Sequence, residues 1–455
     1  MEMPPIGKKF PAEMIDSGIW CFDKFLGSSF LNVLLHLDPA PSRERVVRSL
    51  KRTICQMPIL GSHLERGFWR DRWVPISNLD LEGLVEDIDL GAIQGQEDFE
   101  AAAYNKFKER IPEGIDLGQE PPIKVIVFRN KSQGLLIYRI HHSIADGNGC
   151  LQILHFIGEN LNKELDEETP SPVEMNRSFF KILAPFGIKD IPGILHDIVI
   201  ETFRPWTLLF SRPLWRIGSG GSGTPKLSLA RLSIKTDDYR KLHARARENG
   251  LTMNDLLATA LLALCAEFNG KLPRSSPYLN VNFTVNLRRF FPASQAHITN
   301  LSAMSGLSLR PEKVKNFKGT AKIVREKVGE VKRHYIGLGS ILVPQLMTYL
   351  LPAGLMRWFL SRYGAFTLKQ IGTHSTAVTN IGAMDNYAEV FGKNLKSASV
   401  IAPAWEVGWP IITATGLHNS LTLYFALPYR NEKDASICRD LADRLRYFLL
   451  EWCLK

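Results

Sequence analysis

The amino-acid sequence predicts an α/β fold made of two lobes. Its 455 residues are enough for two domains of ordinary size. Helical periodicity and β-hairpin patterns occur in each half, and a flexible Gly/Ser run, "GSGGSG" at 218–223, lies between them. We therefore expect an N-terminal lobe over residues 1–170, a connecting segment over 171–225 and a C-terminal lobe over 226–455.

The composition is that of a globular protein. Apolar residues make up 45% and charged residues 22% of the chain. The first residues lack a charged segment followed by an apolar one, so no signal peptide is indicated and we expect a cytoplasmic protein. The six cysteines contain no C-x-x-C pair, which favours reduced thiols over a disulfide framework or a zinc site. No bound metal is expected.

The charges are divided unevenly between the two halves. Residues 1–170 carry 19 Lys and Arg against 26 Asp and Glu, a net charge of −7. Residues 171–455 carry 37 against 20, a net charge of +17. This basic half is either a solvated face or a surface for an anionic group, such as a nucleotide phosphate, an acidic carrier protein or a lipid headgroup. No Lys/Arg tract is interleaved with aromatic residues, so nucleic acid is not expected as a partner.

The first half of the chain predicts a helix, a hairpin and a second helix. Ser42 is placed to cap a helix over 43–57, whose apolar residues recur on one face. Two apolar runs within 121–142 flank a short polar turn and predict a β-hairpin, and a helix follows over 150–165. The stretch "RIHHSIADGNG", 139–149, therefore lies between a strand and a helix. Loops held by such rigid elements commonly carry function.

The second half repeats these ingredients. Thr252 and Asp255 have the spacing of a capping box at the start of a helix that ends near Gly270. The run "YLNVNFTVNLR", 278–288, alternates apolar and polar residues and predicts a strand with Arg288 on its polar face. A further hairpin and an amphipathic closing helix are predicted over 410–427 and 435–454.

Two stretches, 191–215 and 336–356, are unusually apolar. The second has no charged residue and is long enough to span a bilayer. Pro344 and Pro352 divide it, however, and would leave backbone groups without hydrogen bonds in lipid. We therefore expect it to help line an apolar acyl or acceptor pocket, through residues such as Leu350, or to rest on a membrane without crossing it.

The histidine-rich stretch admits several interpretations on chemistry alone. A metal site would need further ligands, and no other His/Cys/Asp/Glu cluster has ligand spacing. A serine hydrolase would need a G-x-S-x-G turn, which is missing. A purely structural role remains open, with a histidine capping the helix and Asp146 tying the loop. The other interpretation is a histidine base directed at a substrate hydroxyl or amine, because the imidazole pKa lies near working pH.

"HHSIADG", 141–147, resembles the HHxxxDG signature of an acyltransferase superfamily. This superfamily includes chloramphenicol acetyltransferase, condensation domains of nonribosomal peptide synthetases, alcohol acetyltransferases and bacterial wax ester synthase/diacylglycerol acyltransferases. Three further stretches are similar to the family pattern in the same order: "LTMNDLLATAL", "VNLR" and "STAVTNIG". The resemblance implies two chloramphenicol-acetyltransferase-like lobes with the active site in a tunnel at their interface.

The resemblance also implies roles for the residues of the motif. His142 matches the general base that deprotonates the acceptor, and His141 matches a more structural partner. Asp146 matches the aspartate that forms an ion pair with an arginine and holds the loop. Arg288 is the expected partner because it continues the polar face of its strand, whereas Arg289 falls in the apolar phase.

Three weaker assignments complete the expected site. Gly147 would leave backbone room for a pantetheine arm beside the base. Thr379 or Asn380 would donate to the developing oxyanion. The chain departs from relatives in two places, with "WEVGW" where plant acyltransferases have D-F-G-W-G, and "TNIGAMD" where wax-ester-type enzymes have "SNVPGP".

Three functions are compatible with these residues. The first is transfer of an acyl group from a thioester, acyl-CoA, to a hydroxyl acceptor that is lipid-like or a secondary metabolite. The second is a stand-alone condensation-type reaction that uses an acyl carrier protein and forms an amide or ester with an amine or alcohol. The third is a non-catalytic lipid- or partner-binding relative. We expect no bound cofactor, since the thioester is a co-substrate, and a cytoplasmic monomer that contacts membranes peripherally if at all.

Overall fold

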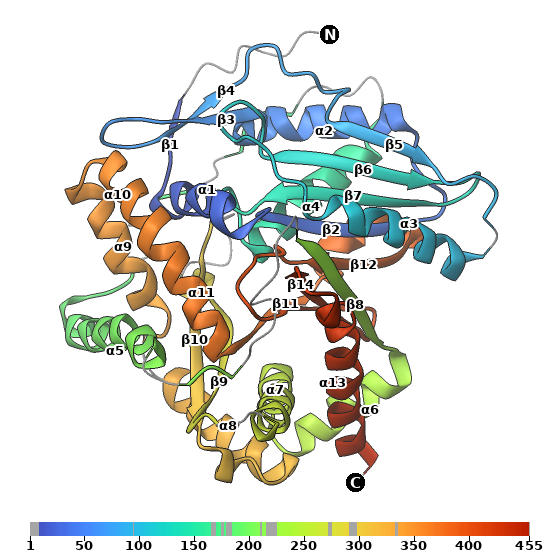
Figure 1. Ribbon diagram of the computed structural model, residues 1–455. Helices are drawn as coiled ribbons and strands as arrows, with labels where there is room; N and C mark the ends of the chain where they lie inside the picture. The colour runs from blue at the N-terminus through green and yellow to red at the C-terminus, as the bar shows by residue number, and fades with distance from the viewer. Residues whose placement is uncertain are drawn as a thin grey trace.

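The computed structural model describes residues 9–93, 95–164, 170–173, 177–178, 184–209, 212–214, 225–271, 275–290, 298–332 and 335–454. These residues form two lobes, each built around a β-sheet with helices packed on it (Figure 1). The two-lobed α/β fold expected from the sequence is confirmed. The Gly/Ser run at 218–223 lies outside the described residues.

The N-terminal lobe contains a five-stranded sheet of order β12-β2-β7-β6-β5 and a small sheet of order β1-β4-β3. Apart from β12, its elements are β1 Phe10–Pro11, α1 Met14–Leu26, β2 Phe30–Leu37, α2 Arg43–Gln56, β3 Ser62–Glu65, β4 Arg72–Pro75, β5 Val85–Asp89, α3 Gln96–Arg110, β6 Ile123–Arg129, β7 Gly134–His141 and α4 Gly147–Asn162.

The C-terminal lobe contains a six-stranded sheet of order β10-β9-β11-β13-β14-β8, on which α7 and α13 pack. The elements after α4 are α5 Ile191–Leu209, β8 Lys226–Ile234, α6 Thr236–Glu248, α7 Met253–Gly270, β9 Leu279–Asn286, β10 Ser302–Leu309, α8 Phe317–Lys332, α9 Leu338–Leu350, α10 Ala353–Phe359, α11 Ala365–His374, β11 Thr376–Ala383, α12 Asp385–Ala388, β12 Leu395–Ile401, β13 Ile411–Leu417, β14 Ser420–Tyr429 and α13 Ile437–Leu454.

One strand crosses between the lobes. Residues 395–401, which the sequence placed in the C-terminal lobe, form β12 and pair antiparallel with β2, so that Val400 lies opposite Val33. The sequence boundary at 226 therefore does not separate the two sheets. The crossover covers an edge of the N-terminal sheet that would otherwise present unpaired backbone groups.

Several elements that local sequence patterns predict are present in the structure. The Ser42 side chain accepts a hydrogen bond from the Arg45 amide and caps α2. Thr252 and Asp255 form the expected capping box at the start of α7. In the β13–β14 hairpin, His418 and Asn419 both have positive φ, 47° and 58°, as a two-residue turn between twisted strands requires.

Strand β9 differs from its prediction in two ways. It ends at Asn286, and Arg288 lies in a short 3₁₀ turn, Leu287–Phe290, rather than in the strand. Its first two polar side chains are buried: Asn280 donates to the His374 carbonyl oxygen at 3.0 Å and Asn282 to the Ser375 hydroxyl at 2.9 Å. Alternation therefore identified the strand, but its polar face is buried at the start of the strand and becomes exposed only at Asn286.

The two apolar stretches form helices at one edge of the molecule. Residues 191–209 form α5, which packs along α9 from the second stretch. Leu350 is 67% exposed, whereas α9 packs through Leu338, Ile341, Leu342 and Gln345. Gly354 of the same stretch lines the larger cavity described below. Within the described residues no single helix is long and apolar enough to cross a membrane, and only α6 with α7, bent by 99°, meet that test together.

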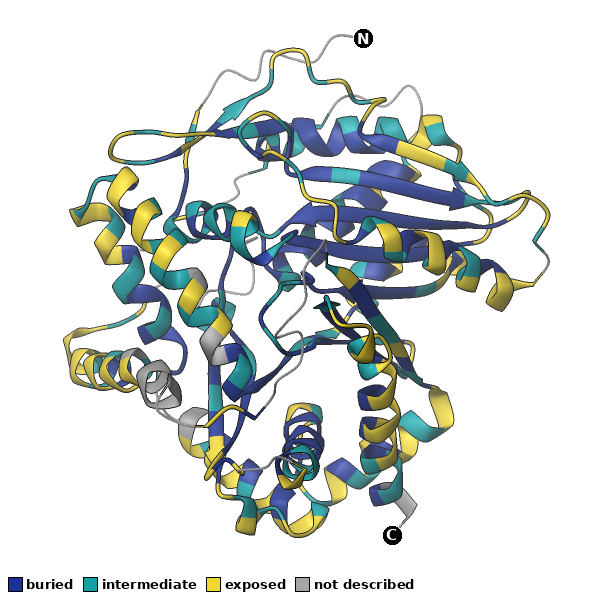
Figure 2. Ribbon diagram, viewed as in Figure 1, coloured by how far each residue is buried: buried dark blue, intermediate teal, exposed yellow. Residues whose placement is uncertain are grey.

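The strands that lead to the motif are rigidly held. Every residue of β2 and β7 is buried, and Figure 2 shows the central strands of the N-terminal sheet in the colour of buried residues. Strand β7 ends at His141 and α4 begins at Gly147. The histidine-rich loop is therefore anchored at both ends.

Candidate active site

His142 lies directly after strand β7, and its ring orientation is fixed from one side. Its backbone amide donates to the carbonyl oxygen of Ser29, which directly precedes the neighbouring strand β2, at 2.9 Å. Its Nδ1 lies 3.1 Å from the Ala145 carbonyl oxygen and 3.0 Å from Oδ1 of Asn300. Both neighbours are hydrogen-bond acceptors, so Nδ1 carries the proton.

The orientation of the Asn300 amide supports this assignment. Its Nδ2 donates to the carbonyl oxygens of His142, at 2.7 Å, and Ser143, at 3.1 Å. Because the amide nitrogen already faces two acceptors, the amide oxygen must face the imidazole. The neutral His142 ring therefore holds its lone pair on Nε2, and no described protein group hydrogen-bonds to that atom.

The surroundings of His142 favour its neutral, basic form. The ring lies nearly parallel to the Trp405 indole, with 6.1 Å between centroids and 13° between planes. Trp405 is held in turn by a 3.0 Å hydrogen bond from its Nε1 to the Ser29 hydroxyl. Burial lowers the pKa of His142 below the ordinary histidine value, against opposing contributions from hydrogen bonds and the Asp146 carboxylate.

His141 is held by the protein on both ring nitrogens. Its Nδ1 lies 2.8 Å from the Ser143 hydroxyl and its Nε2 lies 2.7 Å from the Asp23 carboxylate. The ring also packs edge-on against Phe30. Both nitrogens are occupied and the side chain is 1% exposed, so His141 fits the structural role that the sequence suggested for it.

Asp146 joins three segments of the chain. One carboxylate oxygen accepts from the Gly149 amide and caps α4, at 2.8 Å. The other accepts from Arg288 Nη1 and from the Leu301 amide, each at 2.8 Å. Arg288 also donates through Nη2 to the Thr299 carbonyl oxygen. The structure thus brings together the pair predicted from the sequence, and the fully engaged carboxylate holds the loop.

The remaining predicted residues, Gly147, Thr379 and Asn380, make contacts of their own that do not involve His142. A Cβ added to Gly147 would approach the Ile381 side chain of β11 to 3.0 Å, so the lobes meet closely here. Asn380 of β11 donates to the Asn254 side chain and accepts from the Gly382 amide. The Thr379 side chain has no hydrogen-bond partner among the described residues. No described hydrogen bond links Thr379 or Asn380 to His142.

Three residues of the site were not identified from the sequence. Asn300 and Trp405 fix the His142 ring, as described above. Arg177, in the connecting segment, donates to the carbonyl oxygens of Ile144 and Ile298 and to the Asp16 carboxylate. The only sequence signal for any of them was "WEVGW", noted as a departure from a family motif, which contains Trp405.

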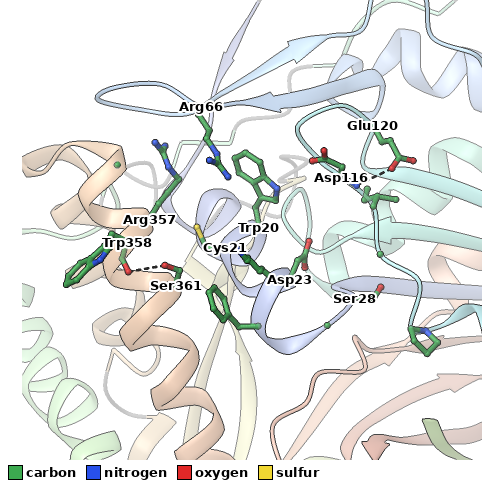
Figure 3. Close-up of a pocket in the computed structure, with 17 residues that line it drawn as sticks. Trp20, Cys21, Asp23, Ser28, Arg66, Asp116, Glu120, Arg357, Trp358 and Ser361 are labelled. Atoms are coloured by element: carbon green, nitrogen blue, oxygen red, sulfur yellow. Dashed lines mark hydrogen bonds between the residues drawn. The ribbon is translucent and has the colours of Figure 1, made fainter. Parts of the chain in front are cut away.

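A cavity of about 910 Å³ opens beside helix α1 (Figure 3). It lies between α1, the loop around Asp116 and the segment that carries Arg357 and Trp358. Asp23 lines this cavity and also forms a hydrogen bond with His141, so the cavity extends to a residue that holds the motif in place. Burial, with a smaller effect of Asp71, raises the pKa of the Cys21 thiol in its wall to about 11. This thiol is therefore a poor nucleophile at neutral pH.

A smaller cavity of about 190 Å³ lies in the C-terminal lobe and is lined by Asn254, Asn286 and Arg289 among others. Asn254 connects it to Asn380 on β11. Among the residues that the structure describes, no three His, Cys, Asp or Glu side chains gather in a way that would hold a metal ion.

Comparisons with known proteins bear on this fold and motif. No family model matches the chain. Over 232 residues it is 30% identical to a coprinoferrin synthetase of Coprinopsis cinerea; this match covers 50% of the chain but 9% of that much longer protein. The first condensation domain of the calcium-dependent antibiotic synthetase superposes with a TM-score of 0.68 at 16% identity, over 98% of this chain and 97% of that one.

An acetyltransferase has the same architecture. Trichothecene 15-O-acetyltransferase from Fusarium sporotrichioides superposes with a TM-score of 0.70 at 10% identity, over 99% of this chain and 98% of that one. At such low identities these likenesses establish the fold. Within this shared fold, the HHSIADG motif of the present chain lies between β7 and α4.

Proposed function

We propose that this chain transfers an acyl group from a thioester to the hydroxyl or amine of an acceptor, with His142 as the general base. The observation that carries the proposal is the state of the His142 ring. Its Nδ1 proton is directed at Ala145 and Asn300, and its Nε2 lone pair is unoccupied by described protein groups. A neutral imidazole whose pKa is lowered by burial remains a base at neutral pH.

In the proposed reaction, His142 Nε2 takes the proton from the acceptor as its oxygen or nitrogen attacks the thioester carbonyl carbon. The new C–O or C–N bond forms, and the C–S bond then breaks as the tetrahedral intermediate collapses. The departing sulfur recovers the proton from the imidazolium, so the base is regenerated. Thr379 is the proposed donor to the oxyanion, because the Asn380 side chain already bonds to Asn254 and Gly382.

Two donors are compatible with the site. An acyl-CoA would use the basic second half of the chain, and Arg289 in the smaller cavity offers a cation for its phosphates. An acyl carrier protein is favoured by the 30% identity to a coprinoferrin synthetase. The acceptor is proposed to be lipid-like or a secondary metabolite, and to approach through the larger cavity, which borders Asp23 beside His141.

Thiol release measures the reaction with either donor. Acyl-CoA of several chain lengths and acyl groups loaded on a phosphopantetheinylated carrier protein are each incubated with alcohols and amines, and free thiol is followed with DTNB while mass spectrometry identifies the product. Turnover with free acyl-CoA establishes the O-acyltransferase reaction, and turnover with the carrier alone establishes the condensation-type reaction. Saturable binding of thioester without thiol release in every combination would refute catalysis and leave a binding protein.

A further inference from the structure

One edge of the molecule carries large apolar side chains that no described part of the chain covers. We call this surface the apolar edge. It comprises the tip of the β3–β4 hairpin and the outward faces of α5, α9 and α10, and its members are 36–74% exposed: Phe68, Trp69, Leu195, Val199, Phe203, Leu346, Met347, Leu350, Leu355, Trp358 and Phe359. In Figure 1 the hairpin, α10, α9 and α5 follow one another down the left side of the molecule.

Contacts between these elements make the apolar edge one continuous surface. The Ala353 amide at the start of α10 donates to the Phe68 carbonyl oxygen at 2.8 Å. The Arg70 guanidinium lies over the Tyr349 ring of α9, 4.4 Å from its centroid. Helix α5 packs along α9 on the other side. On α5 the exposed residues Leu195, Val199 and Phe203 recur every four positions and form a stripe facing away from α9.

The charged side chains of α10 and of the segment that follows it are basic. No Asp or Glu occurs between Glu330 and Asp385, whereas Arg357, Arg362 and Lys369 all fall in that span. The acidic residues of α5 are directed inward. Asp197 accepts from the Tyr335 amide, and Glu201 accepts from the amides of Gly337 and Ser340, where they hold the start of α9. Arg357 is paired with Asp71, whereas Arg362 and Lys369 are exposed on the segment that follows α10.

We infer that the apolar edge docks on an anionic lipid bilayer. Aromatic side chains such as Trp69, Trp358 and Phe359 are suited to the zone between headgroups and acyl chains, and Arg and Lys side chains to anionic headgroups. A monomer rarely leaves so extended an apolar patch uncovered without a partner. A symmetric contact between two copies would bring the same cations face to face, which disfavours a second copy as the occupant.

The larger cavity lies next to the apolar edge. Gly354, Arg357 and Trp358 line the cavity and belong to α10, whose outer face is part of the apolar edge. The cavity therefore opens beside the docked surface and leads toward Asp23. If the proposed acyl transfer holds, an amphipathic substrate would enter it from the bilayer. The docking itself does not depend on that reaction and is tested without it.

Vesicle sedimentation of the full chain tests the docking. The protein is mixed with vesicles of phosphatidylcholine alone or of phosphatidylcholine with phosphatidylserine, and the bound fraction is measured at low and high salt. Binding is expected to the phosphatidylserine vesicles and to weaken as salt rises. The double variant Phe68→Ala with Trp69→Ala should bind at least about tenfold more weakly, because it removes two exposed aromatic anchors that contact each other.

A control variant distinguishes binding through the apolar edge from binding through any exposed aromatic side chain. Tyr447→Ala removes an aromatic side chain that is 49% exposed, against 60–74% for the hairpin pair, from α13, which lies on the other side of the C-terminal lobe in Figure 1. It should bind vesicles as the unmodified chain does, and both variants should keep its melting temperature. Failure to bind phosphatidylserine vesicles would overturn the inference, as would equal binding by both variants. The inference would also be overturned if the hairpin substitutions abolished dimer formation, or binding to an acidic carrier protein, but left vesicle binding unchanged.

Discussion

Asp146 and Arg288 bind the two lobes together at the start of helix α4. The guanidinium Nη1 lies 2.8 Å from the carboxylate Oδ2, and the two side chains are only 12% and 1% exposed. The same carboxylate caps α4 through Gly149 and receives the Leu301 amide. It therefore determines where the loop carrying His142 sits, yet all of its described bonds lead to protein groups.

Replacing Asp146 with Ala should destabilise the protein. The change leaves a mostly buried guanidinium without its counter-ion, which typically costs about 3–5 kcal/mol. Urea unfolding of the variant measures this loss. Glu432→Ala, which removes the partner of the exposed Lys226, is the control and should leave the free energy of unfolding nearly unchanged. An Asp146→Ala protein as stable as the unmodified chain but inactive would mean that the carboxylate takes part in the chemistry.

The pH dependence of the reaction should reveal the environment of His142. The proposed active form is the neutral imidazole, and burial lowers the pKa of this group in the folded protein. The rising limb of kcat/KM against pH should therefore have its midpoint below the ordinary histidine value of about 6.5. Activity is thus retained as pH falls through that value and is lost only at lower pH. A midpoint at or above the ordinary value would contradict the assigned base.

Asn300 is expected to act as a positioning residue. Its oxygen accepts from His142 Nδ1, and this bond opposes the effect of burial by raising the pKa of the ring. Asn300→Ala should lower kcat/KM about tenfold, the equivalent of about one hydrogen bond, and move the rising limb to lower pH. Asn269→Ala, which removes a buried amide bonded to Ser276 elsewhere, is the control for general destabilisation. An unshifted limb in Asn300→Ala would leave Asn300 with a merely structural role.

We expect the aromatic ring of Trp405 and its Nε1 hydrogen bond to contribute separately to the reaction rate. Trp405→Phe keeps an aromatic face beside His142 but loses the bond to Ser29, whereas Trp405→Leu loses both. We expect kcat/KM to fall modestly in the first variant and more in the second, since only the second also removes the flat surface that orients the imidazole. Equal activities for Trp405→Leu and the unmodified chain would show that the parallel rings have no role.

The sequence predicted the parts of the site that are local. The caps at Ser42 and Thr252 depend on neighbouring residues and formed as expected. The alternating strand also formed, although it ends at Asn286, before Arg288. Asn300 lies 158 residues from His142 and belongs to no recognisable pattern, so only the fold reveals their bond. The crossover of β12 to β2 is likewise a long-range pairing without a local signal.

The apolar stretches show a second limit of the sequence. Composition identified them correctly as unusual, but it could not decide which face of α9 packs against the protein. Leu342 is buried whereas Leu350 is exposed, although both are leucines of one apolar helix. Leu342 packs in one cluster with Ile194 of α5 and Val285 of β9, whereas Leu350 is the last residue of α9 and lies outside that cluster. Hydrophobicity alone does not encode this difference.

The central claim is that His142 is the base, and one comparison tests it most directly. The rate of acyl transfer from the thioester that the unmodified chain uses is measured for His142→Ala and for His155→Ala, a partly exposed histidine on the following helix that contacts Glu159. We predict a fall of about 10²–10⁴ for His142→Ala, no significant change for His155→Ala and similar melting temperatures for all three proteins. Full activity in a folded His142→Ala protein would contradict the account.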